Sequence, residues 1–419
     1  SSKRGEMEKE MFAIRLIARN VSRHRYKSIL HILIGVLTVL ILDIYAGNMD
    51  STGEQLAKLP EVLEVPAKIS VLNGSLTEGM TIREDRMMGV RESAYVKDPA
   101  FTVRIKFGLG SFTVEEYADH LNYYGMGINA VAGVPGMKRE DITFLEGVDE
   151  SVLETTQKVC ILDAGLMEEN GLRLGEDVML TIFYYRYEKD GSEIFIEPLT
   201  TDTYRIVGQA EIEDYRGGWM PPEAILPLDC IREAYHSQGF PFFADSGSFV
   251  VKDPFQLNAL KEEMYHDVMF LPVITRAEYR YDGNALTIMD ETFIRSAEAL
   301  QGNLALLRGM LPFVAAIVIF IGYLCSYLSL QSRQEEYALM RSLGTGRGRS
   351  FWLLFGETAL VEAVACLLGS FTALIFLRTK VEVLALAGVL FFLAFLAGTA
   401  AALLALYRLS VMEMLAKND

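Results

Sequence analysis

Four long apolar segments, separated by polar stretches of very unequal length, dominate the pattern along this 419-residue chain. We expect them at residues 29–47, 310–330, 351–377 and 381–407. A helix needs about 20 apolar residues to cross the hydrocarbon core of a bilayer, so each segment can span it. The sequence therefore predicts a membrane protein with four transmembrane α-helices in a one-plus-three arrangement. Residues 48–309 lie between the first and second spans.

Strand and helix patterns alternate through residues 48–309. Apolar side chains recur at every second position in 95–107, which predicts a half-buried strand. Asp253 followed by Pro254 is a typical helix start, so a helix is expected at 254–266 between strands at 248–252 and 268–274. We predict an α+β domain with two subdomains, ending in a helical stalk at 287–309. Further strands are expected at 65–71, 159–162, 178–185, 203–207 and 224–228, and helices at 164–170 and 229–236.

Charge gives the expected orientation of the spans. Residues 48–309 hold 44 acidic and 23 basic residues, a net charge of −21, and the rest of the chain carries +5. Lys and Arg collect on the cytoplasmic flanks of membrane spans. We therefore expect a multi-pass cell-membrane protein with residues 48–309 extracytoplasmic, and with both termini and 331–350 in the cytoplasm. An acidic outer domain also argues against binding nucleic acid. The basic flanks are Arg15, Arg19, Arg23, Arg25 and Lys27 before the first span, Arg333, Arg341, Arg347 and Arg349 after the second, and Arg408 after the fourth.

Residues 8–28 predict a cytoplasmic amphipathic helix on the lipid surface. Its bases Arg15, Arg19, Arg23 and Lys27 recur every four residues and share one stripe, which suits anionic headgroups. The helix is either a simple topology anchor or a lever that transmits force into the first span, and both readings remain open. The first span lacks a small-residue cleavage site, so we expect it to be retained. Residues 408–419 are expected to form a cytoplasmic tail.

The sequence shows no motif of catalysis or metal binding. G-x-S-x-G and H-E-x-x-H are missing, and no histidine has a second histidine or cysteine at ligand spacing. We expect a non-catalytic subunit without a metal. Cys325 and Cys366 read as small residues inside two spans, whereas a disulfide between Cys160 and Cys230 of the outer domain stays open. Residues 215–222 are either a recognition loop or a turn with a packed Trp.

The segment after the second span carries an ordered motif. From residue 333 it reads Arg-Gln-Glu-Glu-Tyr-Ala-Leu-Met-Arg-Ser-Leu-Gly. This resembles the cytoplasmic signature of FtsX/MacB-type ABC transporter permeases, as do the span arrangement and a carboxylate at Glu357. Residues 159–182 and 204–211 are more loosely similar to that family's outer domain, and a proline common in its C-terminal tail is absent from 410–415. The residues that match the signature in order are Glu336, Ala338, Leu339, Met340, Arg341, Leu343 and Gly344.

The resemblance implies that residues 331–350 form a cytoplasmic coupling helix and loop that docks on a dimer of separate ABC ATPase subunits. No G-x-x-x-x-G-K-[ST] occurs in the 419 residues, so we expect ATP and Mg²⁺ on that partner and no cofactor on this chain. A second permease chain is implied, in a homodimer or heterodimer. The expected function is mechanotransmission: ATP hydrolysis moves the outer domain, for efflux or extraction of peptide, antibiotic or lipoprotein substrates. The alternative is an FtsX-like signalling subunit that activates an extracytoplasmic cell-wall hydrolase, a possible outer partner protein.

Polar and small residues inside the third and fourth spans are candidates for helix packing. Glu357 and Glu362 lie about 9 and 16 Å into the third span, where an ionised carboxylate costs at least a few kcal/mol. They either contact a neighbouring subunit or a protonatable path, or else Glu357 reaches the cytosol and Glu362 bonds to a Ser or Thr. Ala394, Gly398 and Ala402 recur at four-residue spacing, which lets helices approach closely. The resemblance implies that these spans pack as a dimer.

Overall fold

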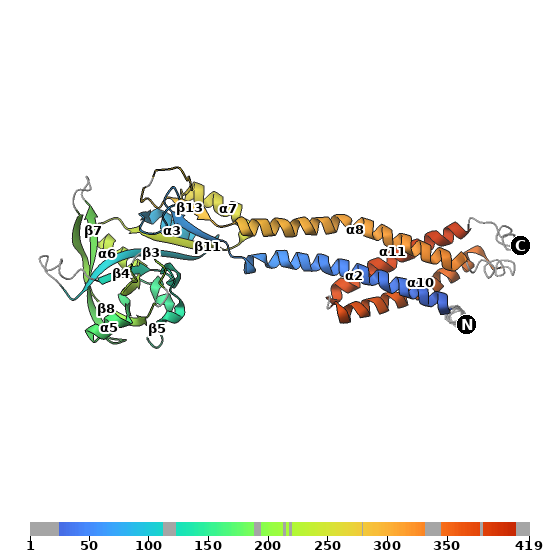
Figure 1. Cartoon of the computed structure of the whole chain (residues 1–419), viewed down its shortest axis with the longest axis horizontal. Coiled ribbons are helices and arrows are strands. Elements are labelled where there is room, and N and C mark those ends of the chain that lie inside the picture. The colour runs from blue at the N-terminus through green and yellow to red at the C-terminus, as the bar shows by residue number, and fades with distance from the viewer. Residues whose placement is uncertain are drawn as a thin grey trace, which may run out of the picture. The chain divides into compact units, whose positions relative to one another are not determined.

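The chain divides into two compact units, and each is described by itself. The computed structural model describes residues 25–111, 123–187, 194–212, 215–217, 220–278, 280–331, 345–377 and 380–407. The helical unit comprises Ser1–Leu59 and Ser296–Asp419, and the sheet unit comprises Pro60–Arg295. Figure 1 shows the elements of both units.

Four long helices build the described part of the helical unit. By length and composition, each is apolar enough to cross a membrane. Large apolar side chains recur every three or four residues along the exposed side of the first helix, as expected for a lipid-facing stripe: Leu30, Leu33, Leu37, Ile41 and Ile44. The helices are α2 (Arg25–Val62), α8 (Glu291–Gln331), α10 (Arg347–Phe376) and α11 (Val381–Tyr407).

The expected stalk and second span form one continuous helix, α8. This helix begins at Glu291 rather than at residue 287, because residues 285–288 pair as a strand. Pro312 lies inside α8 without ending it. The first span likewise continues past the apolar segment, since α2 runs to Val62. Hydropathy predicts the apolar part of such a helix. It does not predict where the helix ends, because that depends on the next element along the chain.

The sheet unit is built from thirteen strands and four short α-helices among its described residues. The helices are α3 (Glu84–Glu92), α5 (Ala164–Asn170), α6 (Leu228–Ser237) and α7 (Leu257–Glu262). The strands are β1 (Pro66–Ser70), β2 (Ile82–Arg83), β3 (Val96–Leu109), β4 (Tyr123–Ile128), β5 (Ile142–Phe144), β6 (Val159–Asp163), β7 (Asp177–Tyr187), β8 (Ile194–Ala210), β9 (Ala224–Pro227), β10 (Phe243–Ala244), β11 (Ser246–Val251), β12 (Leu271–Pro272) and β13 (Ala285–Ile288).

One large mixed sheet organises this unit. Ten strands follow the order β12-β13-β1-β11-β3-β4-β9-β6-β8-β5, and β7 pairs with both β3 and β8. The remaining strands, β10 and β2, form a two-stranded sheet. Most neighbours are antiparallel, but β4–β9, β6–β8 and β12–β13 are parallel. The α+β class expected from the sequence is therefore present.

Local sequence signals located α5 well and the helix at 254–266 less well. Asp163 accepts hydrogen bonds from the Gly165 and Leu166 amides, and Gly171 ends α5 with a φ of 65°, so both caps match their residue types. Asp253 likewise caps Phe255. Residues 254–267, however, divide into a 3₁₀ turn, α7 and a π-helical turn, and β12 covers only two residues of the strand expected at 268–274.

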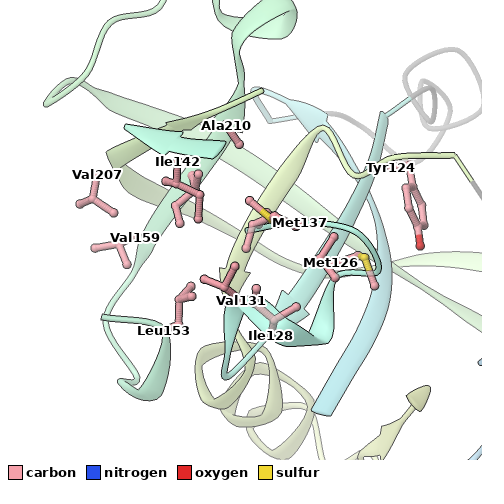
Figure 2. Packing of buried hydrophobic residues seen from close by; sticks show 13 residues of the cluster. Tyr124, Met126, Ile128, Val131, Met137, Ile142, Leu153, Val159, Val207 and Ala210 are labelled. Atoms are coloured by element: carbon pink, nitrogen blue, oxygen red, sulfur yellow. The ribbon is translucent and has the colours of Figure 1, made fainter. Parts of the chain in front are cut away.

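A buried apolar cluster fills one part of the sheet unit (Figure 2). It joins side chains of β4, β5, β6, β8 and β9, including Met126, Ile142, Ile161 and Ile225, all at most 5% exposed. Burial of such side chains contributes roughly 25 cal/mol per Å² of apolar surface. Cys160 and Cys230 are free thiols in the structure, and both are buried.

Candidate functional site in the helical unit

A buried polar contact of the helical unit joins α2 to α10. His31 of α2 and Glu362 of α10 form a side-chain hydrogen bond across 331 residues of sequence. Glu362 is fully buried and His31 is 7% exposed. Leaving a carboxylate unpaired at this depth would cost several kcal/mol. His31 of the same chain is the partner of Glu362, whereas the sequence left open a neighbouring subunit, a protonatable path, or a nearby Ser or Thr.

Small residues let α10 approach α2 around this pair. A Cβ added at Gly35 would lie 2.7 Å from the Cβ of Ala365, and one at Gly369 would lie 2.7 Å from the Cβ of Val39. Both distances are too short for real atoms. The absence of these side chains therefore allows the backbone spacing at which His31 reaches Glu362.

The fourth-span stripe packs against α8 of the same chain. A Cβ at Gly398 would lie 2.2 Å from the carbonyl oxygen of Ile319 and 2.6 Å from the amide nitrogen of Tyr323. The next residue, Thr399, forms a buried hydrogen bond with Ser326 of α8, with the two hydroxyl oxygens 2.8 Å apart. The missing side chain at Gly398 therefore allows this close approach of α11 to α8. Its neighbours in the stripe also lie inward, with Ala402 fully buried in a cluster with Leu354 and Leu403, and Ala394 packed on the cluster around Phe395.

Two further carboxylates are buried in these helices. Glu357 of α10 is 5% exposed, so it does not reach solvent within the described structure. Asp43 of α2 is fully buried, and neither carboxylate oxygen has a hydrogen-bond partner among the described residues. Asp43 and His31 are both polar positions inside the first apolar segment. That position alone could have marked them for attention.

A second set of contacts joins the helices beyond the buried pair. Lys380, just before α11, lies 3.0 Å from Asp50 and 2.8 Å from Glu54, both on α2. These groups are about half exposed, so solvent screens the ion pairs and they contribute little to stability. The Tyr45 hydroxyl donates to the Leu307 carbonyl and so joins α2 to α8.

Part of the predicted site lies outside the described residues. This holds for the whole coupling signature, Glu336, Ala338, Leu339, Met340, Arg341, Leu343 and Gly344, and for Arg15, Arg19 and Arg23 of the lead-in helix. Lys27 falls within α2, but its side chain is not described. Within the described residues, no group of three or more His, Cys, Asp or Glu could hold a metal ion.

Comparison with known proteins gives little sequence support for any family. No family model matches the chain, and no curated protein matches its sequence. Among solved structures, the periplasmic region of MacB from Actinobacillus actinomycetemcomitans matches 56% of this chain and 92% of its own length, at 8% identity and a TM-score of 0.30. Similarity at this level leaves both fold and function to be argued from the chain itself.

Proposed function

We propose that this chain is the permease subunit of an ABC transporter, in which ATP hydrolysis on a separate chain moves an extracytoplasmic domain. The observation that carries the proposal is the ordered signature from Glu336 to Gly344 between α8 and α10. Seven of its positions agree in residue type and order with a surface that docks an ATPase in the family it resembles. Four membrane-length helices and an α+β unit provide the matching framework.

Continuous helices support transmission of motion along the chain. Both α2 and α8 contain residues of both units, because Pro60–Arg295 includes the last residues of α2 and the first of α8. Pro60 of α2 and Pro312 of α8 are the points at which these helices can bend. Between such points a helix keeps a rise of about 1.5 Å per residue, so displacement of its cytoplasmic end would be passed along its axis.

Contacts inside the helical unit would make the four helices respond together. The signature segment connects α8 to α10 in the sequence. The His31–Glu362 pair joins α10 to α2, and the close approach at Gly398 joins α11 to α8. A push on residues 331–350 by a partner would therefore reach both helices that continue into the sheet unit.

Two functions fit a membrane subunit that transmits motion in this way. Export or extraction of peptide, antibiotic or lipoprotein substrates is favoured by the size of the sheet unit, Pro60–Arg295, which resembles transporter members more than the smaller signalling type. Activation of a cell-wall hydrolase is the second candidate. The two are separated by whether the purified complex stimulates substrate release from a membrane or stimulates a hydrolase.

Charge reversal in the signature tests the proposal. When the chain is purified together with the proteins encoded beside it, an ATPase should copurify and its ATP hydrolysis should be stimulated, and Arg341→Glu or Gly344→Leu should reduce that stimulation at least tenfold. Arg276→Glu is the control, since Arg276 is an exposed base of the sheet unit, outside residues 331–350. If the double variant Arg341→Glu/Gly344→Leu hydrolyses ATP like the wild type, the docking role is wrong.

A further inference from the structure

Asp43 of α2 is a buried carboxyl that none of the contacts described above involves. Its side chain is fully buried, and neither carboxylate oxygen has a hydrogen-bond partner among the described residues. The residue lies inside the apolar segment at 29–47. A polar group that is buried without a partner costs free energy, so such a group usually binds something that the protein itself does not supply.

Apolar side chains from the other three long helices pack around this part of α2. Val39, one turn before Asp43, and Leu42, directly before it, belong to one buried cluster. Asp43 is therefore enclosed by protein in an apolar interior, where an ionised carboxylate is costly. The other members of the cluster are Val318 of α8 and Phe391 and Phe395 of α11, and Cys366 of α10 packs against them.

Among the described residues, no base lies close enough to Asp43 to offset its burial. Lys380 pairs with Asp50, which is seven residues further along α2 and so about 10 Å away along the helix axis. His31 lies twelve residues before Asp43, about 18 Å away along the axis, and is hydrogen-bonded to Glu362. Neither base reaches the Asp43 carboxyl.

The ionisable groups that face the same interior are thiols, a carboxyl and a phenol, and none of these can become a cation. One of the thiols, Cys366, lies within electrostatic reach of Asp43. The phenol already donates its hydrogen bond to a carbonyl of α8. These groups are Cys366 and Glu362 of α10, Cys325 of α8 and Tyr45 of α2, while residues 383–406 of α11 contain no ionisable side chain.

A proton is the ligand that fits these surroundings. Protonation removes the charge of the carboxylate and adds no heavy atom, so it needs no cavity. A metal ion would need several ligands, and the described residues include no group of three or more His, Cys, Asp or Glu that could hold one. The carboxylic acid then remains a buried polar group, which costs less than a buried charge.

We propose that Asp43 is a proton-binding site, which holds a proton while the four helices are packed and releases it to water when α2 separates from its neighbours. An aspartate that is exposed to water is ionised above about pH 4. Packing of the helical unit therefore takes up one proton, and its opening releases that proton. Binding of this proton needs neither ATP nor a partner chain, so it is independent of the proposed coupling.

Infrared spectroscopy of the full chain in detergent at pH 5 tests the protonation state directly. A protonated carboxyl has a C=O stretching band that an ionised carboxylate lacks. Subtracting the spectrum of Asp43→Asn from that of the wild type should leave one such band. Asp50→Asn makes the same chemical change on α2 at a residue that is paired with Lys380 and partly exposed, and its subtraction should leave no such band.

The pH dependence of thermal unfolding measures the bound proton. The fluorescence of Trp352 on α10 reports on the helical unit in a chain with Trp219→Phe. Because the packed chain holds a proton that the unfolded chain releases, raising the pH from 5 to 8 should destabilise the wild type relative to Asp43→Asn. The midpoint of Asp43→Asn should therefore rise by about 3 °C or more relative to the wild type. The difference between the wild type and Asp50→Asn should stay constant.

Asp43→Leu keeps the test decisive if Asp43→Asn does not fold. A leucine is of similar size and needs no partner, so this variant should give folded chain and the same infrared and pH differences. Absence of the carboxylic-acid band, or parallel pH dependence of the wild type and the Asp43 variants, would overturn the proposal. If neither variant folds at any pH, the carboxylate is required as an ion and the proposal is wrong.

Discussion

A single buried side chain, Glu362, shows how much a membrane-depth residue depends on its neighbours. Glu362 was a candidate for helix packing only because of the free-energy cost of burying a charge. A carboxylate among apolar side chains must be neutral or paired. The sequence could not name the partner, since His31 is 331 residues away and the two meet only after α2 and α10 pack. The same cost applies to Asp43, which is equally buried.

Two substitutions of Glu362 distinguish the effect of its side-chain shape on folding from the effect of its charge. Glu362→Gln keeps the size and the hydrogen bond to His31, so the yield of folded chain in detergent should stay within a factor of two. Glu362→Lys leaves a buried cation facing His31 and should lower the yield at least tenfold, consistent with a cost of about 3–5 kcal/mol. Glu382→Lys, at an exposed position on α11, is the control and should change little. Equal yields for Glu362→Gln and Glu362→Lys would place the side chain at a water-accessible surface.

The cysteines of the sheet unit, Cys160 and Cys230, should be inert in the folded chain. Burial raises the pKa of Cys160 to about 12 and also raises that of Cys230, so neither thiol ionises appreciably at neutral pH. Because the thiolate is the reacting form, maleimide should label neither residue at pH 7 or pH 8, and both should react once the unit unfolds. Thr156→Cys, at an exposed position, should react within minutes under the same conditions. Rapid labelling of native Cys160 would show that the unit opens at equilibrium.

At the scale of elements, local sequence signals predicted the ends of a helix correctly where the chemistry of a single residue fixes the backbone conformation. The caps of α5 are such a case, since an Asp side chain and a glycine at positive φ specify a start and an end. The strand expected at 268–274 failed because pairing depends on a distant partner. Only Leu271 and Pro272 find one in β13, and Met269 takes a positive φ of 66°. The order of the large sheet could not be read from the chain at all, because most of its neighbours are joined by long-range contacts.

Packing of α8 on α11 gives a prediction with a matched glycine control. Gly398→Ala places a Cβ against backbone atoms of Ile319 and Tyr323, which cannot move aside locally, so it should destabilise the helical unit by about 1–3 kcal/mol. Gly302→Ala on α8 has nothing within 4 Å of the added Cβ and should stabilise by up to about 1 kcal/mol through helix propensity. Thermal unfolding in detergent measures both. If the two variants shift the midpoint alike, the close approach at Gly398 does not hold the helices together.

At the scale of the whole molecule, the pattern of apolar segments predicted four membrane-length helices, and the structure has four among its described residues. Composition also separated an acidic stretch from a basic remainder, and the acidic stretch corresponds closely to the sheet unit, Pro60–Arg295. The coupling role of residues 333–344 rests on sequence, and it requires these residues to face the compartment that contains ATP.

Membrane topology is therefore the measurement that tests the account most directly. Single cysteines at Ser192, in the acidic domain, and at Thr345, beside the signature, would be labelled on intact cells with a maleimide that cannot cross the membrane, in a chain otherwise free of cysteine. We predict labelling of the residue-192 cysteine from outside, and labelling of the residue-345 cysteine only after the cells are opened. The reverse pattern would place the signature away from ATP and contradict the proposed function.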